Sequence, residues 1–341
     1  MKLNGLANLG NTCFLNSCIQ IMLRIEDLNK FLDEKKYRMM LKDIPDSQIL
    51  LEWDSLRELL QQHKNCVIAP NGFLKAVQKV AMHKDIDIFT GYAQNDMPEF
   101  LIFFVNCMHT AISREVNMKI TGTEINAIDK LAKIGYTTMK NIYEADYSEM
   151  IDMFFSLSVT TIFDTNEENK DYLSIKFDPI FMVSLPVPRD RDISLYDCFN
   201  EYCKLERMEN EDQWFNEKTN QKQDALKQSS FWSLPKYLII DLKRFDNRLR
   251  KIDKHIHIPI EGLDLSRYVC GYNSSGYVYD LMGVVNHMGN VLSGHYIANI
   301  QDENKGWWEM NDSSVRQLKI EEVINKNSYC LFYKKREKTV E

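Results

Sequence analysis

The sequence predicts an α+β fold, with a helical first part of about 145 residues followed by an antiparallel sheet. Two observations predict it. Apolar residues recur at helical spacing in the first part. In the second part they form short runs rich in β-branched and aromatic side chains, bounded by turn residues. No internal repeat or low-complexity linker separates the two parts, so we expect a single domain.

Helical periodicity marks several segments of the first part. The segment that starts at Cys13 has Asn11 or Thr12 before it to cap its first turn. The last segment starts at Asp96 and is almost wholly apolar, which predicts a buried helix. The segments expected to be helical are 13–22, 49–63, 70–83 and 96–112.

The second part contains short runs that are typical of strands. The polar stretch 189–230 lies between them, and we expect a projecting hairpin or a loop there. The segments expected to be strands are 153–163, 181–188, 236–245, 277–285, 295–301, 306–310 and 328–334.

The bulk composition excludes several classes of protein. The net charge of −7 over 341 residues argues against binding to nucleic acid, which needs clustered Lys and Arg. No apolar run is long enough to span a membrane, and the first residues lack the pattern of a secretory signal. The 8 cysteines are scattered without a Cys-x-x-Cys pair. We therefore expect an intracellular protein, cytoplasmic or nuclear, with reduced thiols.

Cys13 stands at the start of a predicted helix, directly after the loop 8–12. The partial positive charge of a helix N-terminus favours a thiolate, so we expect a lowered pKa at this cysteine. Asn8 lies on the approach loop and can donate its side-chain N–H to an oxyanion. Taken alone, a cysteine at this position is more often a buried structural thiol, and the pattern favours a nucleophile only together with the histidine residues of the second part.

A catalytic thiol needs a histidine as its base, and two candidates lie close together in the second part. His295 follows Ser-Gly at the start of a predicted strand, whereas His287 ends the strand before it. If 295–301 and 306–310 form a hairpin, Asn311 comes back beside His295 and can orient the imidazole. From the residues alone, His287 stays open as the base.

The sequence resembles the ubiquitin-specific proteases, a family of papain-like cysteine peptidases, in two long boxes and three further stretches. The boxes are "GLANLGNTCFLNS" (5–17) and "NHMGNVLSGHYIANI" with "WWEMNDSSV" (286–315). The stretch "QNDMPEFL" (94–101) is similar to the family's Gln-Gln-Asp-x-x-Glu-Phe segment, and 181–188 and 234–245 resemble its palm strands. The resemblance covers nearly the whole chain.

The resemblance implies a catalytic machinery and a fold shaped like a right hand. Cys13 would be the nucleophile, His295 the base and Asn311 the residue that orients it. Asp312 would be an auxiliary polar residue, and Asn8 the oxyanion donor.

The domain, 1–341, would have a thumb at about 1–150, fingers at about 151–235 with interleaved palm strands, and a palm at about 236–341. We also expect a minimal catalytic core without an N-terminal accessory domain.

The same resemblance implies that the partners are ubiquitin and ubiquitinated proteins, which a monomer would bind. Asp96 and Glu99 match acidic positions that contact the basic tail of ubiquitin, and Gln94 opens the same segment. Tyr296 matches an aromatic residue that lines the passage for the Gly-Gly end. For Asp96 and Glu99, a capping role at the helix start is the alternative.

The sequence departs from the family pattern at two places. Many members bind zinc through two Cys-x-x-Cys pairs at the fingertips, but 160–170 and 214–224 contain no cysteine, so we expect no metal and no cofactor. Pro98 replaces a polar residue within the acidic segment. Two alternatives to an active deubiquitinase stay open, namely a catalytically silent ubiquitin-binding scaffold and a peptidase for a ubiquitin-like modifier.

Overall fold

The computed structural model describes residues 3–166, 172–189, 192–291 and 293–337. Its helices are α1 (Cys13–Met22), α2 (Glu26–Asp33), α3 (Asp46–Gln62), α4 (Asn71–His83), α5 (Met97–Ile112), α6 (Ala127–Tyr143), α7 (Glu149–Phe154) and α8 (Leu195–Cys203). All four predicted helices are therefore confirmed, as α1, α3, α4 and α5.

The strands lie mostly in the second part, as predicted. They are β1 (Gly5–Leu6), β2 (Val67–Ile68), β3 (Ser156–Phe163), β4 (Tyr172–Ile180), β5 (Val183–Pro186), β6 (Ile193–Ser194), β7 (Leu205–Met208), β8 (Trp214–Asn216), β9 (Gln221–Gln223), β10 (Ala225–Phe231), β11 (Tyr237–Lys243), β12 (Ile256–His257), β13 (Leu263–Asp264), β14 (Val278–Gly289), β15 (Gly294–Gln301), β16 (Trp307–Asn311), β17 (Ser314–Leu318) and β18 (Ser328–Lys335).

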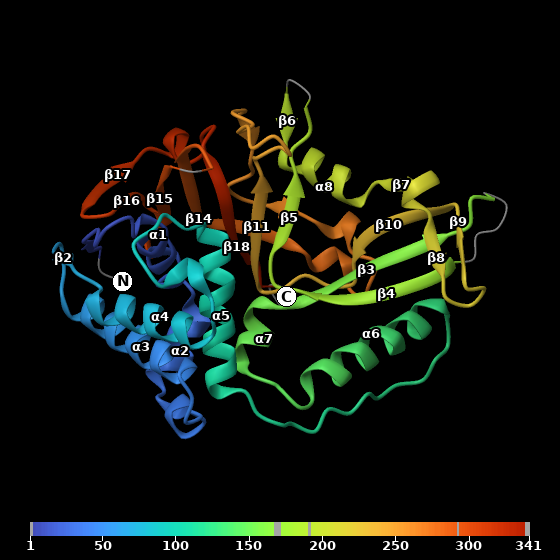
Figure 1. Cartoon of the computed structure of the whole chain (residues 1–341), viewed down its shortest axis with the longest axis horizontal. Coiled ribbons are helices and arrows are strands. Elements are labelled where there is room, and N and C mark those ends of the chain that lie inside the picture. The colour runs from blue at the N-terminus through green and yellow to red at the C-terminus, as the bar shows by residue number, and fades with distance from the viewer. Residues whose placement is uncertain (1–2, 167–171, 190–191, 292, 338–341) are drawn as a thin grey trace.

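Two sheets organise the second part of the chain. The larger has the order β17-β16-β15-β14-β18-β11-β5, with β13 paired to β14, and the smaller has the order β4-β3-β10-β7. The larger sheet is antiparallel except that β5 pairs with β11 in parallel. The stretch 189–230, expected to be a hairpin or loop, also contains the helix α8, which packs on β5 and β10. The same stretch contains the hairpin β8–β9, which projects from the body as expected (Figure 1).

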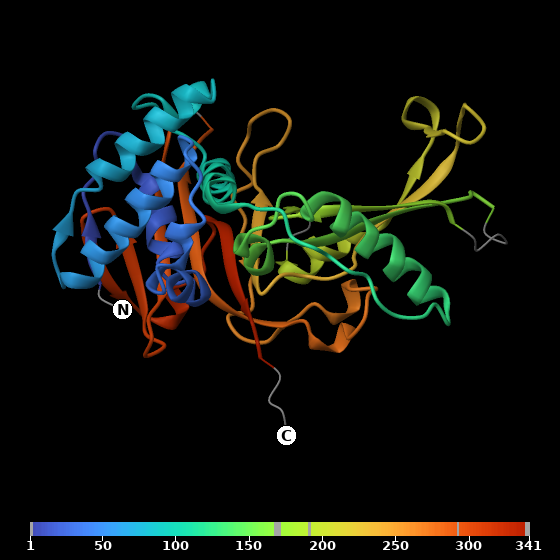
Figure 2. The same cartoon turned by 90° about the horizontal axis from the view of Figure 1, so that it is seen from below.

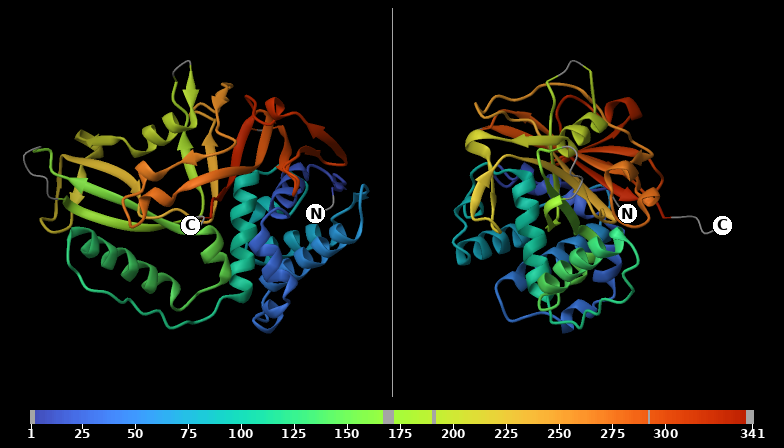
Figure 3. Two further views of the ribbon diagram at one scale, coloured as in Figure 1. Left: turned by 180° about the vertical axis from the view of Figure 1, so that it is seen from behind. Right: turned by 90° about the vertical axis from the view of Figure 1, so that its right-hand side faces the viewer.

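The helices cover the two sheets on different sides. Helices α1 to α5 pack on one face of the large sheet, and α8 lies on its other side (Figure 1). The long helix α6 runs along the four-stranded sheet, as the view from behind also shows (Figure 3). The α+β class predicted from the two kinds of periodicity is thus the observed one.

Helix α1 contacts both the other helices of the first part and the large sheet of the second part. Every residue of α1 is buried, and the helix packs against β15 and against α5. A Cβ atom at Gly283 of β14 would lie 2.5 Å from Cδ1 of Ile21, so the glycine lets the helix come this close to the sheet. The start of α1 is therefore held rigidly against the strands that carry the histidine box.

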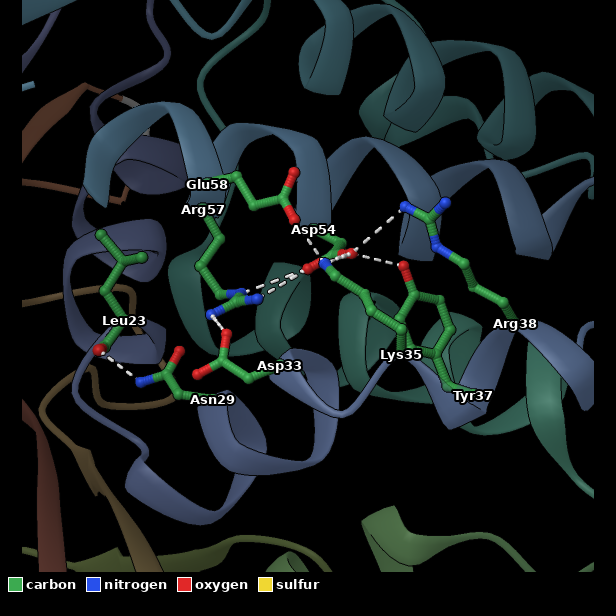
Figure 4. A network of polar contacts seen from close by, with 9 residues as sticks. All are labelled: Leu23, Asn29, Asp33, Lys35, Tyr37, Arg38, Asp54, Arg57 and Glu58. Carbon is green, nitrogen blue, oxygen red and sulfur yellow. Dashed lines mark hydrogen bonds and ion pairs between the residues drawn. The ribbon is translucent and has the colours of Figure 1, made fainter. Parts of the chain in front are cut away.

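A cluster of charged side chains, which we call the Asp54 cluster, ties α2 to α3 (Figure 4). The fully buried Asp54 carboxylate accepts hydrogen bonds from Lys35, Tyr37 and Arg57 at 2.5, 2.5 and 2.8 Å. Arg57 is also fully buried and reaches Asp33 at 2.7 Å. Burial alone would raise the pKa of Asp54, but these donors outweigh it and lower that pKa below its usual 3.8.

None of the helices formed by the described residues has the length and apolar character that a membrane crossing requires.

Candidate active site

Cys13 is the first residue of α1, and the loop before it is held by one side chain. The side-chain oxygen Oδ1 of Asn8 accepts hydrogen bonds from the backbone N–H groups of Gly10 and Thr12, at 3.0 and 3.2 Å. Thr12 is the N-cap residue, but its side chain makes no capping bond to the helix, nor does that of Asn11. The capping predicted for Asn11 or Thr12 is therefore wrong, because the Thr12 hydroxyl accepts from Leu9 instead.

His295 and Asn311 meet as the predicted hairpin requires. Strands β15 and β16 are antiparallel, and Nε2 of His295 lies 2.8 Å from Oδ1 of Asn311. The Asn311 amide oxygen can only accept, so Nε2 carries the proton. This tautomer leaves Nδ1 of His295 unprotonated and able to take a proton from a thiol.

Cys13 lies beside the start of β15, close to this pair. The backbone N–H of Tyr296, the residue after His295, hydrogen-bonds to the thiol of Cys13. Within the part of the chain that the structure describes, no hydrogen bond joins the thiol to His295 itself. The thiol therefore contacts the residue next to His295 and not the imidazole itself. Catalytic hydrogen bonds between a thiol and an imidazole often tighten only when substrate binds.

The pKa of the Cys13 thiol is raised above its usual 9.0, so the expected lowering is wrong for the resting site. Burial is the largest cause, and the negative charge of Asp312 adds to it. The N–H groups of Tyr296 and of the first turn of α1 act in the opposite direction but do not outweigh burial. A thiol that is only 4% exposed gains less from a helix N-terminus than it loses in hydration.

Asp312 connects two asparagine side chains instead of acting on the histidine. Its carboxylate accepts from Nδ2 of Asn8 and from Nδ2 of Asn16, both at 2.8 Å. An amide nitrogen has two hydrogens, so Asn8 keeps one N–H that Asp312 does not use. Asn16 was missed by the sequence analysis, although its place three residues after Cys13 on α1 puts it on nearly the same side of the helix.

A cavity of about 270 Å³ opens in front of Cys13. Gln94 lines it and accepts a hydrogen bond from the backbone N–H of Gly294 at 2.6 Å, which connects the loop before α5 to the start of β15. Tyr296 also lines this cavity, which we call the groove. The structure therefore brings Gln94, Asp96 and Tyr296 together with Cys13.

Asp96 uses both carboxylate oxygens within the protein. Oδ1 accepts from the backbone N–H of Glu99 at 3.1 Å, so the alternative capping role is confirmed for Asp96 but not for the Glu99 side chain. Oδ2 accepts from the hydroxyls of Tyr296 and Tyr329, at 3.2 and 2.9 Å. The Glu99 carboxylate is exposed and makes no hydrogen bond or ion pair with any described residue, which leaves it open to a partner.

His287, which the residues alone left open as the base, is a buried wall of the groove. Its ring packs 4.7 Å from the Tyr296 ring, and no described residue hydrogen-bonds to its Nδ1. Burial, with a contribution from the charge of Lys251, lowers the pKa of His287 to about 4. A base with this pKa would be too weak for a thiol, which favours His295.

The two segments 160–170 and 214–224 are those where the sequence predicts no metal site, and the second contains strands that are joined by side-chain hydrogen bonds. Asn216 donates to Gln223 across the hairpin β8–β9 at 2.9 Å, and Gln213 donates to Asp224 at 2.8 Å. In the described ranges, no three His, Cys, Asp or Glu side chains gather as metal ligands would. Residues 167–170 of the predicted fingertip segment lie outside the described residues.

The comparison with protein families decides what this arrangement belongs to. The sequence model of the family described as "Ubiquitin carboxyl-terminal hydrolase" matches residues 4–333. The chain belongs to this family. The resemblance stated from the two boxes is thereby confirmed, because both boxes lie within the matched range.

Relatives within the ubiquitin carboxyl-terminal hydrolase family are distant in sequence. Ubiquitin carboxyl-terminal hydrolase 2 from Bos taurus is 29% identical over 345 residues, covering 97% of this chain and 55% of the relative. The chain thus spans about half the length of that relative. A probable ubiquitin carboxyl-terminal hydrolase from Acanthamoeba polyphaga mimivirus is 24% identical, with 97% of this chain and 90% of the relative covered.

Solved structures share the fold. The SAGA Ubp8/Sgf11/Sus1/Sgf73 DUB module bound to ubiquitin aldehyde contains a chain that matches with a TM-score of 0.75 at 24% identity. The match covers 99% of this chain and 70% of that chain. At this identity the likeness supports the fold and not the activity, and it confirms the predicted papain-like α+β architecture.

Proposed function

We propose that this chain is a deubiquitinating thiol isopeptidase, which hydrolyses the bond after the C-terminal Gly of ubiquitin. The hydrogen bond between His295 and Asn311, formed beside the Cys13 thiol in a chain that the family model matches over 4–333, carries the proposal. The names of the relatives and the ubiquitin aldehyde bound by the solved DUB module support the choice of ubiquitin.

In the proposed reaction, Nδ1 of His295 takes the thiol proton, and the Cys13 sulfur attacks the carbonyl carbon of the terminal glycine. The bond from that carbon to the lysine nitrogen breaks, and the imidazolium gives its proton to the leaving amine. Water then attacks the thioester with His295 as base, which releases the ubiquitin carboxylate and restores the thiol. Asn311 keeps the imidazole in the tautomer that this sequence needs.

The negative charge that develops on the carbonyl oxygen needs N–H donors in place beforehand. In the proposal, Asn8 provides one through the amide hydrogen that Asp312 leaves unused. The backbone N–H of Cys13 is a second donor, since the first turn of a helix has no intrahelical acceptor for it. Asp312 is then a positioning residue that fixes the orientation of Asn8.

The tail of ubiquitin would lie in the groove with its glycines next to Cys13. Glu99 is the carboxylate best placed to meet a basic residue of the tail, because it is exposed and without an internal partner among the described residues. Asp96 would act mainly by holding Tyr296 and Tyr329 in place. Gln94 would exchange its bond to Gly294 for the backbone of the tail.

The division of the chain and its cellular setting are further parts of the proposal. The thumb at about 1–150 and the palm at about 236–341 would flank the tail, and the fingers at about 151–235 would hold the body of ubiquitin. All 8 cysteines are free, which supports a reducing environment, cytoplasmic or nuclear. We propose a monomer that acts without metal or cofactor.

The experiment is reaction with a ubiquitin that carries a C-terminal electrophile, read by intact mass and peptide mapping. We expect one adduct on Cys13, and none in the His295→Ala variant. The exposed thiol of Cys270 is an internal control for unspecific alkylation. Binding without an adduct would support a silent scaffold, and neither binding nor adduct would direct attention to ubiquitin-like modifiers.

A further inference from the structure

A second cavity, of about 570 Å³, lies away from the groove, and we call it the α6 pocket. It is bounded by the second half of α6, by the residues that follow β10, by the turn 272–277 before β14, and by the end of β18. It shares no lining residue with the groove. In the view from below, α6 lies on the side of the molecule away from α1 to α4 (Figure 2). The α6 pocket is therefore a separate candidate site, at the junction of α6 with both sheets.

Aromatic rings form the walls of the α6 pocket. Tyr136 of α6 and Tyr272 of the turn both pack edge-on against the Trp232 ring, at centroid distances of 6.2 and 5.7 Å. Trp232 is buried, whereas both tyrosines are exposed. The Tyr272 hydroxyl also donates to Asp129, which holds its ring in place. The pocket therefore presents fixed aromatic surface to a ligand, as small-ligand sites with aromatic walls do.

The charged side chains that line the α6 pocket are both cations. Nζ of Lys335 lies 3.6 Å from the centroid of the Tyr277 ring, a cation–π contact. The Arg336 guanidinium pairs with Asp280 at 2.7 Å, and 49% of its side chain is exposed. No carboxylate of a described residue lines the pocket. In a chain whose net charge is −7, this local excess of cations favours an anionic ligand.

The backbone around the α6 pocket favours carboxylates over phosphates as that anion. Phosphates usually bind at a helix N-terminus or a glycine-rich loop. Tyr136 and Met139 belong to the second half of α6, away from its N-terminus, and Gly276 is the one glycine among the described lining residues. Carboxylates next to an apolar ring match both the cations and the aromatic walls. A peptide with acidic residues on either side of an aromatic one has this composition.

We propose that the α6 pocket binds a short acidic segment of a partner protein. An aromatic side chain of the segment packs between Tyr136 and Tyr272, and the carboxylates beside it pair with Lys335 and Arg336. The site goes beyond the proposed function, because it shares no residue with the groove and binds whether or not the chain hydrolyses ubiquitin. Since α6 and both sheets bound the pocket, the bound segment connects the first part of the chain to the second.

The test follows the indole N–H signal of Trp232 by nuclear magnetic resonance in protein made with isotope-labelled tryptophan. The Trp232→Phe variant identifies this signal among those of the 5 tryptophans. The probe is the acetylated and amidated peptide Asp-Asp-Phe-Asp-Asp, for which we expect a saturable shift of the Trp232 signal with a Kd on the order of 10⁻⁴ M. The peptide with Ser in place of Phe should bind at least about tenfold more weakly. The peptide with Lys in place of each Asp should leave the signal unmoved.

Three results with these peptides would overturn the inference. The first is no shift of the Trp232 signal at about 1 mM of the Phe-containing acidic peptide, ten times the expected Kd. The second is equal affinity for the acidic and the basic peptide, which would exclude a role for the cations. The third is equal affinity for the Phe and the Ser peptide, which would exclude an aromatic anchor.

Two matched pairs of variants place the contact in the pocket. Tyr136→Ala should raise the Kd of the acidic peptide at least about tenfold, and alanine keeps α6 helical. Ile134→Ala, at a position on the same helix that is 39% exposed against 38% for Tyr136 but does not line the pocket, should change the Kd less than about twofold. Arg336→Gln should raise the Kd about threefold to tenfold, and Arg316→Gln, which removes a similarly exposed and paired arginine elsewhere, should leave it unchanged. Equal effects within either pair, in variants with an unchanged melting temperature, would contradict the proposed site.

Discussion

The Asp54 cluster and the groove handle buried polar groups in opposite ways. In the cluster, each oxygen of the Asp54 carboxylate has a cationic or hydroxyl donor, and the buried Arg57 has two carboxylate partners (Figure 4). At the groove and beside it, several buried polar atoms have no hydrogen-bond partner among the described residues. These atoms are Asn16 Oδ1, Asp241 Oδ1 and His287 Nδ1.

The pKa values of two aspartates express this difference. Burial acts to raise both, but the donors around Asp54 lower its pKa below the usual 3.8. Among the described residues, one hydroxyl donates to Asp241, that of Ser184, and burial together with the charge of Asp96 raises the pKa of Asp241 to about 6. The paired charges of the Asp54 cluster thus contribute stability, whereas the unpaired polar groups at the groove and beside it lower the stability of the protein.

The comparison predicts that polar residues at the groove affect rate and those of the cluster affect stability. His295→Ala is the strongest test of the first half. We expect kcat to fall by about 10³- to 10⁴-fold, since the base that activates the thiol is gone. The free energy of unfolding should change by less than about 1 kcal/mol, because the lost hydrogen bond to Asn311 is only partly buried. Steady-state kinetics and urea denaturation on one preparation measure both. A kcat within tenfold of the unmodified chain would contradict the assignment of the base.

Asp54→Asn tests the second half. It removes the charge that compensates the fully buried Arg57 and leaves that guanidinium with only the exposed Asp33 carboxylate, so breaking this buried pair should cost about 3–5 kcal/mol of unfolding free energy. The reactivity of the folded fraction toward the ubiquitin electrophile should stay unchanged. Urea denaturation and labelling at low temperature measure the two.

Glu58→Gln is the matched control for Asp54→Asn. Glu58 pairs with the same Lys35 but is 42% exposed, so its loss should cost less than about 1 kcal/mol. Equal costs for the two variants would show that burial does not set the strength of this cluster.

Asn8 gives a smaller effect on rate and separates two roles of one side chain. Asn8→Asp keeps an acceptor for the N–H groups of Gly10 and Thr12 but loses the amide donor, and it faces the Asp312 carboxylate. We expect kcat to fall by about 10²- to 10³-fold, as for other lost oxyanion donors.

The double variant Asn8→Asp with Asp312→Asn restores the hydrogen bond between the two positions with its direction reversed. It should recover the stability lost in Asn8→Asp but not the rate. Recovery of kcat as well would mean that Asn8 acts through the loop and not as a donor to the oxyanion.

Much of this site could be predicted from the sequence, because it depends on local rules. A helix start puts Cys13 at an N-terminus, and an antiparallel hairpin returns Asn311 to His295 whatever the rest of the fold does. The family boxes supplied the choice of His295 over His287, which the residues alone left open.

What the sequence did not give depends on distances across the fold. Asn16 meets Asp312, 296 positions away, and nothing in the local pattern of either residue signals the contact. The raised pKa of Cys13 comes from burial in the folded protein and from the charge of Asp312, which together outweigh the effect of the helix N-terminus. The helix α8 was not predicted from the sequence because its short amphipathic stretch lies within a polar region.

The last predicted effect on stability has the opposite sign. In the folded protein the pKa of Asp241 is about 6, above the usual 3.8, so the folded state binds the proton more tightly than the unfolded chain does. Asp241 therefore costs no stability below about pH 4. Its cost grows as the pH rises toward 6 and reaches its full value above that pH. The difference corresponds to about 3 kcal/mol at 1.36 kcal/mol for each pH unit. Asp241→Asn should recover about 2 kcal/mol of this at pH 7, since the amide also leaves one buried polar atom unpaired, and nothing at pH 4.

Urea denaturation of Asp241→Asn and Asp54→Asn at pH 7 and pH 4 compares the unfolding free energies of the two regions directly. Because the folded pKa of Asp54 lies below 3.8, its contribution is present at pH 7 and declines only as the pH falls through that lower value. The same chemical replacement should therefore stabilise the protein at one aspartate and destabilise it at the other, with both effects clearest at neutral pH. A loss of stability in Asp241→Asn at pH 7 would mean that the second oxygen of Asp241 has a donor after all, and the contrast between the two regions would then reduce to the number of charges in each.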